Sequence, residues 1–415
     1  MSLANELQAR GFIHQTTADD LSALLDGPPR VVYHGIDPTA DSIHAGNFAV
    51  FMLLSHLARH GHHIILLIGG GTGMIGDPKP DVERPLTPPE EVAQRAAKLK
   101  QQATQLLQTG AITVVNNHDW LSELKLIDFL RDIGKHFTVN ELIKKDAIAE
   151  RLQGQHGISY TEFAYPLLQG YDYLQLHQAY GCDLQVGGSD QWGNILAGVE
   201  LVRRKTGATV DALTIPLIVD KATGKKFGKS EGNAVWLDPE KTTPFQFYQF
   251  WLQVSDESVI DYLKLFTFIP CTEIAELATT HTADPSARVA QRALAEAVTS
   301  IVHGKEAATA AVEVSNLLFG TGHSTTLSAT ERTMLLENAP HYPVATDTPV
   351  REVLVASGLA ASNREARTFL SEGAVSLNGS PVTDINALVT ADDFTSSVAI
   401  LKRGKKQLVV LEQIS

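Results

Sequence analysis

The stretch RVVYHGIDPTADSIHAGNFAVFMLLSHLARH, residues 30–60, begins with a short apolar run and ends with a longer segment of helical periodicity. Four more apolar runs follow, with helical segments between them, at residues 62–70, 111–117, 182–188 and 213–219. Strands that alternate with helices in this order predict a parallel sheet covered on both faces. The sequence therefore predicts an α/β domain over residues 1–220.

The rest of the chain divides into further units. Residues 120–181 are almost entirely helical in pattern and predict an insertion between two strands of the sheet. Alanine-rich amphipathic segments then replace the strands, so residues 221–320 predict a loop followed by an all-helical domain. Residues 321–345 gather Gly, Pro, Ser and Thr, the composition of a linker, and residues 346–415 predict a small C-terminal α+β domain.

Composition and charge exclude several classes of protein. The 415 residues are too many for one core, and no run of apolar residues is long enough for a membrane span. The start of the chain lacks the apolar core of a signal peptide, so a cytoplasmic protein is expected. Cys182 and Cys271 are far apart and predict neither a disulfide framework nor a structural zinc site. The net charge of −13 argues against indiscriminate binding to polyanions, so any phosphate contact must be local.

KFGKS, residues 226–230, follows the last predicted strand and concentrates positive charge in this acidic chain. A lysine-rich glycine loop is most often a solvated turn. Its alternative is a phosphate-binding loop, because ammonium groups pair with phosphate oxygens. A partner motif elsewhere in the chain has to decide between the two interpretations.

The segment after the first strand offers such a partner. Asp41 or Ser42 can cap a helix that has His44, Gly46 and Asn47 in its first turn. Free backbone N–H groups and the positive end of the helix dipole suit a nucleotide phosphate at that point. Glycine in this turn would let a base or ribose approach the backbone closely.

A third glycine-rich segment imitates a dinucleotide-binding loop. Gly71, Gly73 and Gly76 fit the G-x-G-x-x-G pattern after a strand. The dinucleotide fold needs a helix immediately afterwards, and Pro78 and Pro80 would break it. The glycines therefore predict a close backbone approach without a nicotinamide cofactor.

HAGN, residues 44–47, and KFGKS resemble the two signature motifs of the class I aminoacyl-tRNA synthetases. Together with GIDPTADSIHAG, GDP and GGSDQWGN they look like the bacterial-type tyrosyl-tRNA synthetase family, and the resemblance runs over essentially the whole chain. It implies a Rossmann-like catalytic domain that activates L-tyrosine with ATP and Mg²⁺ and then charges tRNA(Tyr). It also implies a homodimer whose interface lies in the helical insertion. No zinc and no other protein-bound metal are expected.

The resemblance assigns residues to the activation chemistry, in which negative charge grows on phosphate oxygens and cations must be placed to meet it. The implied catalytic residues are Thr39, His44, Lys226 and Lys229. The implied ATP-binding residues are Asp37, His44, Gly46, Asn47, Gly188, Asp190, Lys226, Phe227, Gly228, Lys229 and Ser230.

This chain departs from the family pattern at two points. Asn47 stands where the family has histidine, and its amide can still donate a hydrogen bond. The loop after Asp77 is shorter than usual, so either Lys79 or Arg84 takes the part of the family lysine.

Tyrosine specificity has its own set of residues by the same resemblance. The implied tyrosine-binding residues are Tyr33, Asp77, Asn117, Tyr165, Gln169, Asp172, Gln185 and Gln191. Tyr33 and Asp172 would bracket the substrate phenol, and spacings of four and three place Tyr165, Gln169 and Asp172 on one helix face. An ordinary amphipathic helix is the alternative explanation of that stripe. A site of this kind rejects phenylalanine because its buried polar groups would lose their partner.

The C-terminal unit resembles a small RNA-binding fold named after a ribosomal small-subunit protein. The residues expected to contact tRNA are Arg364, Arg367, Lys402, Arg403, Lys405 and Lys406. Residues 346–415 contain seven Lys and Arg and eight Asp and Glu, so this unit is not basic overall. RNA is therefore expected to bind a single face on which basic residues gather.

Two rival functions remain open on the sequence. A tryptophanyl-tRNA synthetase would share the fold, but the pair Tyr33 and Asp172 and the C-terminal unit disfavour it. A synthetase-derived RNA-binding protein without catalysis is disfavoured by the intact lysines of KFGKS.

Overall fold

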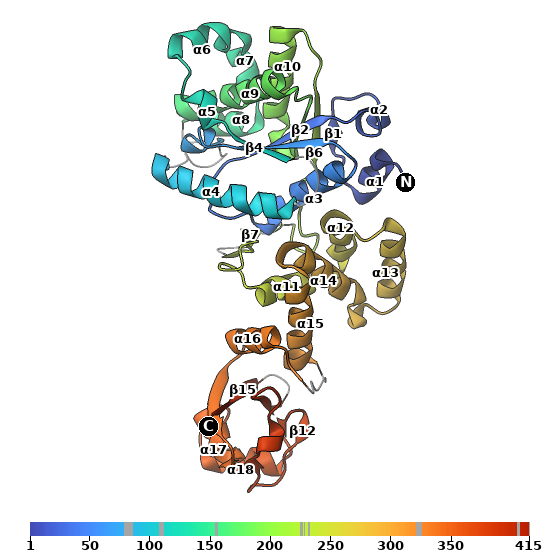
Figure 1. Ribbon diagram of the computed structural model, residues 1–415, viewed down its shortest axis with the longest axis vertical. Coiled ribbons are helices and arrows are strands. Elements are labelled where there is room, and N and C mark those ends of the chain that lie inside the picture. Colours follow the sequence, from blue (N-terminus) through green and yellow to red (C-terminus); the bar gives the residue numbers. More distant parts are fainter. Residues whose placement is uncertain are drawn as a thin grey trace. The chain divides into compact units, whose positions relative to one another are not determined.

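The structure is a computed structural model (Figure 1). It describes residues 1–415 except for 79–85, 108–111, 154–156, 225, 226, 228, 231, 232, 321–325, 405, 406 and 415, and except for the side chains at 146, 147, 229, 230 and 233. Contacts divide the chain into two compact units. The first comprises Met1–Lys241 and Val254–Ala290, and the second comprises Thr242–Gln253 and Gln291–Ser415.

A sheet with the strand order β1-β6-β5-β2-β3-β4 forms the centre of the first unit. Its strands are β1 Gln15–Thr16, β2 Val31–Ile36, β3 His63–Ile68, β4 Ile112–Asn116, β5 Leu184–Gly188 and β6 Asp211–Ile215. Every pairing is parallel except that of β1 with β6. The predicted parallel, Rossmann-like sheet is confirmed. The short antiparallel edge strand β1 was not predicted.

Helices cover both faces of this sheet, with α3 and α4 on one side and α9 and α10 on the other (Figure 1). The helices that lie wholly in the first unit are α1 Leu3–Arg10, α2 Leu21–Leu25, α3 Ala45–Arg59, α4 Pro89–Leu106, α5 His118–Leu121, α6 Leu126–Asp132, α7 Val139–Leu142, α8 Asp146–Gln153, α9 Tyr160–Tyr180, α10 Trp192–Thr206, α12 Asp256–Phe266 and α13 Cys271–Ala283. Helix α3 is buried nearly all round because it lies between the sheet and α12, where Phe48 stacks on Phe266 at 5.9 Å between ring centroids. The stretch α5 to α9 is the predicted helical insertion between β4 and β5.

Short elements complete the first unit. They are the 3-10 turns η1 Thr72–Met74, η2 Gly134–His136, η3 Ser189–Gln191 and η4 Pro285–Ala287 and the strands β7 Lys229–Ser230 and β8 Asn233–Ala234. No helix in the described part of the chain is both long and apolar enough to cross a bilayer.

The entry into α3 differs from the sequence prediction. The helix begins at Ala45 with His44 in the N-cap position, and neither Asp41 nor Ser42 caps it. The Ala45 N–H instead donates to the Val235 carbonyl at 2.8 Å. This bond accompanies a β-bridge between His44 and Trp236. Tertiary pairing therefore replaces the local cap that the composition had indicated.

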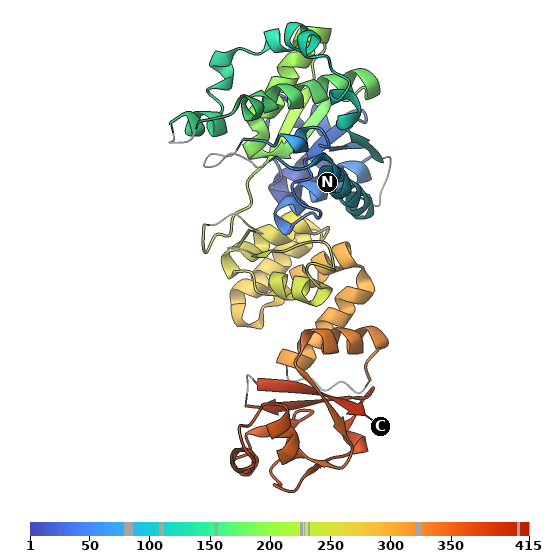
Figure 2. The ribbon, with the colours of Figure 1, turned by 90° about the vertical axis from the view of Figure 1, so that its left-hand side faces the viewer.

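Helix α14 Val289–His303 spans the boundary between the two units. The second unit also contains α11 Pro244–Leu252, α15 Lys305–Phe319, α16 Ala329–Asn338, α17 Val350–Ala356, α18 Asn363–Ser371, η5 Ala391–Asp393 and the strands β9 His341–Ala345, β10 Thr348–Pro349, β11 Val375–Leu377, β12 Ser380–Pro381, β13 Leu388–Val389, β14 Val398–Arg403 and β15 Gln407–Ile414. The larger sheet has the order β12-β11-β14-β15-β9. Figure 2 shows its long red strands β14 and β15 side by side as an antiparallel hairpin.

The region predicted as a linker, 321–345, contains regular structure over part of its length. Helix α16 starts with a capping box between Ser328 and Glu331. Strand β9 pairs in parallel with β15, and Val344 lies in the core of the C-terminal domain. The Gly, Pro, Ser and Thr content thus includes helix-capping and strand residues as well as connecting chain.

Candidate active site

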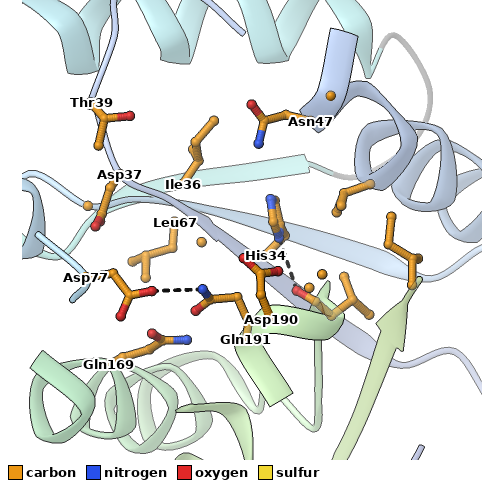
Figure 3. Close-up of a pocket in the computed structure, with 18 of the residues that line it drawn as sticks. His34, Ile36, Asp37, Thr39, Asn47, Leu67, Asp77, Gln169, Asp190 and Gln191 are labelled. Atoms are coloured by element: carbon orange, nitrogen blue, oxygen red, sulfur yellow. Dashed lines mark hydrogen bonds between the residues drawn. The ribbon is translucent and has the colours of Figure 1, made fainter. Parts of the chain in front are cut away.

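A cavity of about 330 Å³ lies in the first unit, where the parallel strands end (Figure 3). Open parallel sheets bind ligands at the carboxyl ends of their strands. The predicted site residues that line this cavity are Tyr33, Asp37, Thr39, His44, Gly46, Asn47, Asp77, Tyr165, Gln169, Asp172, Gln185, Gly188, Asp190, Gln191 and Phe227. The fold thus gathers at one place side chains that come from widely separated motifs.

Tyr33 and Asp172 are two deeply buried residues of the cavity lining. Tyr33 is on β2 and Asp172 on α9, and both are almost fully buried. The Tyr33 ring packs edge-on against Tyr173 with 5.1 Å between centroids, which fixes its orientation. Burial, with the charge of Asp172 nearby, raises the pKa of Tyr33 well above its ordinary value, so its hydroxyl stays protonated.

Asp172 is held by two donors. Asn117 Nδ2 donates to Asp172 Oδ2 at 2.9 Å, and Trp120 Nε1 donates to Oδ1 at 2.8 Å. Burial raises the pKa of Asp172 to about 7, against the opposing effect of these two hydrogen bonds. Asn117 therefore contacts Asp172 and does not line the described cavity, whereas the resemblance implied that it binds tyrosine.

Several buried polar atoms in this cavity have no hydrogen-bond partner among the described residues. They are the Tyr33 hydroxyl and the side-chain carbonyl oxygens of Gln169 and Gln185. Buried polar groups in proteins are nearly always satisfied, so unsatisfied ones in a single cavity indicate a polar ligand. The cavity is thus built for a ligand that offers hydrogen-bond donors at more than one position.

Two further carboxylates of the cavity lining, those of Asp37 and Asp77, are positioned by side chains from other elements. Gln191 Nε2 donates to Asp77 Oδ2 at 2.9 Å, as Figure 3 shows with a dashed line. The Tyr165 hydroxyl donates to Asp37 Oδ2 at 2.9 Å, and the Thr72 hydroxyl donates to Asp37 Oδ1 at 2.7 Å. Two fixed anions therefore face a space that could accept a substrate ammonium group.

The HAGN segment and the KFGKS segment meet at Gly46. A Cβ atom at this position would lie 2.8 Å from the Phe227 carbonyl oxygen and 2.9 Å from the His44 ring. Phe227 is anchored by packing on Tyr262, with 4.6 Å between ring centroids. Glycine is required at this turn because the backbone of the second motif lies directly against it.

Asp190 folds over the end of β5. A Cβ atom at Gly188 would lie 2.5 Å from Asp190 Oδ1, so the carboxylate covers the glycine backbone. Asn47 lines the opposite part of the cavity, at the start of α3 (Figure 3). The carboxylate of Asp190 and the amide of Asn47 thus belong to the lining of the same cavity.

Some predicted residues lie outside the described part of the structure. Lys226 and Gly228 are among them, as are both candidates in the 79–85 loop, Lys79 and Arg84. Lys229 and Ser230 are described in backbone only, as strand β7. Their assignment as catalytic or ATP-binding residues stays a prediction.

The residues predicted to bind tRNA fall into different environments. Arg364 and Arg367 are exposed on α18, and the Arg403 guanidinium lies 4.6 Å from the centroid of the Phe369 ring. Lys402 instead donates from Nζ to the carbonyls of Leu317 and Leu318 at 3.2 and 3.1 Å, at the end of α15. Lys405 and Lys406 lie outside the described residues.

Sequence reasoning missed three residues of this site. Trp120 donates to Asp172, and Asn194 donates to Asp77 at 3.2 Å. Thr72 donates to Asp37. Asn194 was within reach, because it ends the quoted stretch GGSDQWGN, and Thr72 sits in the rejected glycine-rich loop. Trp120 had no local signal beyond its place after a predicted strand.

Comparison with known proteins agrees with this arrangement. Residues 26–320 match the family described as tRNA synthetases class I (W and Y), and the chain therefore belongs to that family. Residues 331–411 match the tyrosine–tRNA ligase SYY-like C-terminal domain. The chain is 45% identical to the tyrosine–tRNA ligase of Streptococcus uberis and 44% identical to that of Lactococcus lactis subsp. cremoris, over 99% of this chain and 100% of each relative. Within the class I family it is a tyrosine–tRNA ligase.

Solved structures share its fold. A C-terminally truncated mitochondrial tyrosyl-tRNA synthetase of Aspergillus nidulans is 31% identical with a TM-score of 0.68, covering 77% of this chain and 94% of that chain. A tryptophanyl-tRNA synthetase of Plasmodium falciparum has a TM-score of 0.55 at 14% identity, covering 74% of this chain and 86% of that chain, and shares the fold alone. The full-length relatives above thus favour tyrosine over the tryptophan alternative.

Proposed function

We propose that this chain uses the described cavity to activate L-tyrosine with ATP, giving tyrosyl-adenylate and pyrophosphate, and then transfers tyrosine to the 3′-terminal adenosine of tRNA(Tyr). The observation that carries the residue assignment is that Tyr33 and Asp172 line one cavity together with the unsatisfied side-chain oxygens of Gln169 and Gln185. Pyrophosphate exchange measured with each of the twenty amino acids tests it. Exchange with tyrosine alone is expected, and exchange with tryptophan instead would overturn the assignment.

The proposed orientation of tyrosine follows from the polar groups that line the cavity. The substrate phenol reaches Tyr33 and Asp172, and the α-ammonium group reaches Asp77 and Gln169. The carboxylate of the substrate then points toward the HAGN segment, where it attacks the α-phosphate of ATP and pyrophosphate departs. The protein contributes mainly by positioning and electrostatics. Mg²⁺ enters with the ATP phosphates, as is usual for this hard cation.

ATP lies, in this proposal, between the start of α3 and the KFGKS segment. His44 and Asn47 face the cavity there, and Gly46 brings the HAGN segment directly against the Phe227 carbonyl of the KFGKS segment. Thr39 lines the same region, beside Asp37. Lys226 and Lys229 complete the site from the loop and meet the charge on the departing pyrophosphate.

Lys226→Ala and Lys229→Ala are each expected to lower the rate of adenylate formation by about 100-fold while the dissociation constant for tyrosine stays within about twofold. The reason is that each ammonium group pairs with pyrophosphate most strongly in the transition state. Single-turnover adenylate formation and equilibrium dialysis with tyrosine measure the two quantities. Lys221→Ala, at an exposed lysine before the loop, is the matched control. Weakened tyrosine binding at an unchanged rate would contradict the assigned role.

We also propose a homodimer that forms through the helical insertion. Val139, Ile143 and Leu152 are 61%, 37% and 51% exposed in the single chain. Leu142 and Ile148, two other apolar residues of the insertion, are 4% and 1% exposed and belong to the chain's own core. Apolar side chains that stay exposed along one insertion favour burial against a second copy.

Light scattering at micromolar concentration is expected to return twice the chain mass of 45.0 kDa. Val139→Glu combined with Leu152→Glu is expected to shift the particle toward the monomer mass, because charges would have to be buried at the interface. Leu388→Glu, at an exposed leucine in the second unit, is the control and should leave the mass unchanged. A monomeric wild-type protein would end this proposal.

The remaining assignments complete the proposal. The unit 346–415 binds tRNA through Arg364, Arg367 and Arg403. The protein acts in the cytoplasm. The catalytic domain 1–220 and the helical domain 221–320 carry activation. A match of residues 331–411 to a tyrosine–tRNA ligase C-terminal domain supports the RNA-binding assignment.

A further inference from the structure

Lys145 is a lysine of the helical insertion that reaches the back of the active site. It lies between α7 and α8, and its Nζ donates to the Gly193 carbonyl and, at 3.3 Å, to Asn194 Oδ1. Its stem runs along Gly193, where an added Cβ would lie 3.7 Å from Lys145 Cγ. The insertion is therefore connected to the first turn of α10 by a charged group.

The Asn194 side chain links Lys145 to two residues of the candidate active site. Asn194 Nδ2 donates to Asp77 Oδ1 at 3.2 Å and to Gln191 Oε1 at 3.3 Å. Gln191 Nε2 in turn donates to Asp77 Oδ2 at 2.9 Å. Asp77, which faces the cavity, is thus linked through one amide to Lys145.

The ammonium group sets the direction of every hydrogen bond in this network. An ammonium group can only donate, whereas a side-chain amide can turn either its oxygen or its NH₂ toward a neighbour. Because Lys145 occupies the oxygen of Asn194, the NH₂ of that amide must face Asp77 and the oxygen of Gln191. Gln191 then has only its NH₂ left for the other carboxylate oxygen. Without Lys145, either amide could rotate and place an oxygen against the Asp77 carboxylate.

Electrostatics act in the same sense. Desolvation lowers the pKa of Lys145 to about 8, and the charge of Asp77 opposes that fall. The attraction is mutual, so a protonated Lys145 favours the ionised form of Asp77. A carboxylate with both oxygens oriented by donors is prepared to receive an ammonium group from the cavity side.

We propose that Lys145 is a positioning residue for the α-ammonium group of tyrosine, because it fixes the Asn194 amide and so holds Asp77 as an acceptor toward the cavity. This proposal rests on the proposed function, in which Asp77 receives that group. It predicts that Lys145 matters for ligands that carry the ammonium group and not for ligands that lack it.

The test measures binding of three ligands by equilibrium dialysis: tyrosine, tyramine, which keeps the ammonium group, and 3-(4-hydroxyphenyl)propanoate, which lacks it. In Lys145→Met the affinities for tyrosine and tyramine are expected to fall about tenfold, and the affinity for the propanoate less than twofold. Lys144→Met, at the exposed neighbouring lysine, is the matched control and should change none of the three. The retained propanoate affinity also reports that the variant has folded.

A second variant tests the route. Asn194→Leu keeps Lys145 and removes the connecting amide, so it should show the same loss for ammonium ligands, and Lys145→Met should add nothing to it. It also serves if Lys145→Met does not fold. Additive losses, an equal loss for all three ligands, or no loss would each overturn the role of Lys145. A wild-type protein that failed to bind or activate tyrosine would instead overturn the proposed function itself.

Discussion

Asp172→Asn is expected to lower kcat/KM for tyrosine by about 1000-fold while the KM for ATP changes less than about threefold. The carboxylate accepts hydrogen bonds from Asn117 and Trp120 and still faces the cavity. An amide has one acceptor oxygen, so it would turn a donor toward one of these donors or toward the substrate phenol. Pyrophosphate exchange with tyrosine and ATP varied separately measures both constants. An equal loss for both substrates would indicate a damaged fold and not a specificity role.

Tyr33→Phe is the companion variant on the other side of the phenol. Its hydroxyl has no hydrogen-bond partner among the described residues, so its removal leaves no donor or acceptor of those residues unsatisfied. The preference for tyrosine over phenylalanine is expected to narrow about tenfold, the worth of one hydrogen bond in a buried site. Unchanged discrimination would remove Tyr33 from the specificity argument.

The pH dependence of tyrosine binding gives a second view of Asp172. Burial raises the pKa of this carboxyl to about 7, so the empty site takes up a proton as the pH falls through that value. A bound phenol donates to the ionised form, and binding therefore has to expel the proton. The dissociation constant should rise about tenfold for each pH unit below 7 and stay level between 7 and 8. Asp172→Asn should abolish this dependence on the carboxyl.

A chain that ends at Gly320 is expected to keep pyrophosphate exchange within about twofold of wild type and to lose at least about 1000-fold in tRNA charging. The cavity is lined by residues of the first unit, whereas Arg364, Arg367 and Arg403 lie in the second. What remains after truncation is an acidic body that attracts RNA weakly. Exchange and charging are measured on the same preparation.

The position of the stop matters because strand β9 pairs with β15. A stop at Ala345 would leave β9 without its partner, so the cut belongs before α16. Arg364→Ala combined with Arg367→Ala in the full chain is the matched control, and it should weaken charging while exchange is unchanged. Loss of both activities in the truncated chain would mean that the C-terminal residues support the catalytic fold. Full charging would mean that tRNA is held elsewhere.

The sequence predicted the sheet well because buried parallel strands leave continuous apolar runs. It could not predict β1, since two residues of an antiparallel edge carry no such signal. The predicted cap of α3 was wrong for a related reason. Asp41 and Ser42 have the composition of a cap, but a β-bridge to a segment far along the chain decides where the helix begins.

The site was predictable wherever a residue belongs to a motif and not where it acts through another side chain. Gln191 lies in a recognisable stretch, and its neighbour Asn194 could have been added from the same stretch. The roles of Lys145 and Trp120 could not be predicted from the sequence. Lys145 contacts α10 and Trp120 contacts α9, and each contact joins residues about 50 positions apart. The pKa of Asp172 likewise depends on burial, which spacing along a helix does not report.

Gly46 and Phe227 lie far apart in the chain, and yet the carbonyl of one occupies the space that a side chain on the other would need. The two segments of the proposed nucleotide site are therefore not free to change independently of each other. Any larger residue at position 46 requires the KFGKS segment to move away from it. A single substitution at this position therefore disturbs both segments. What is inherited at this point is the pair, and each member limits the changes open to the other.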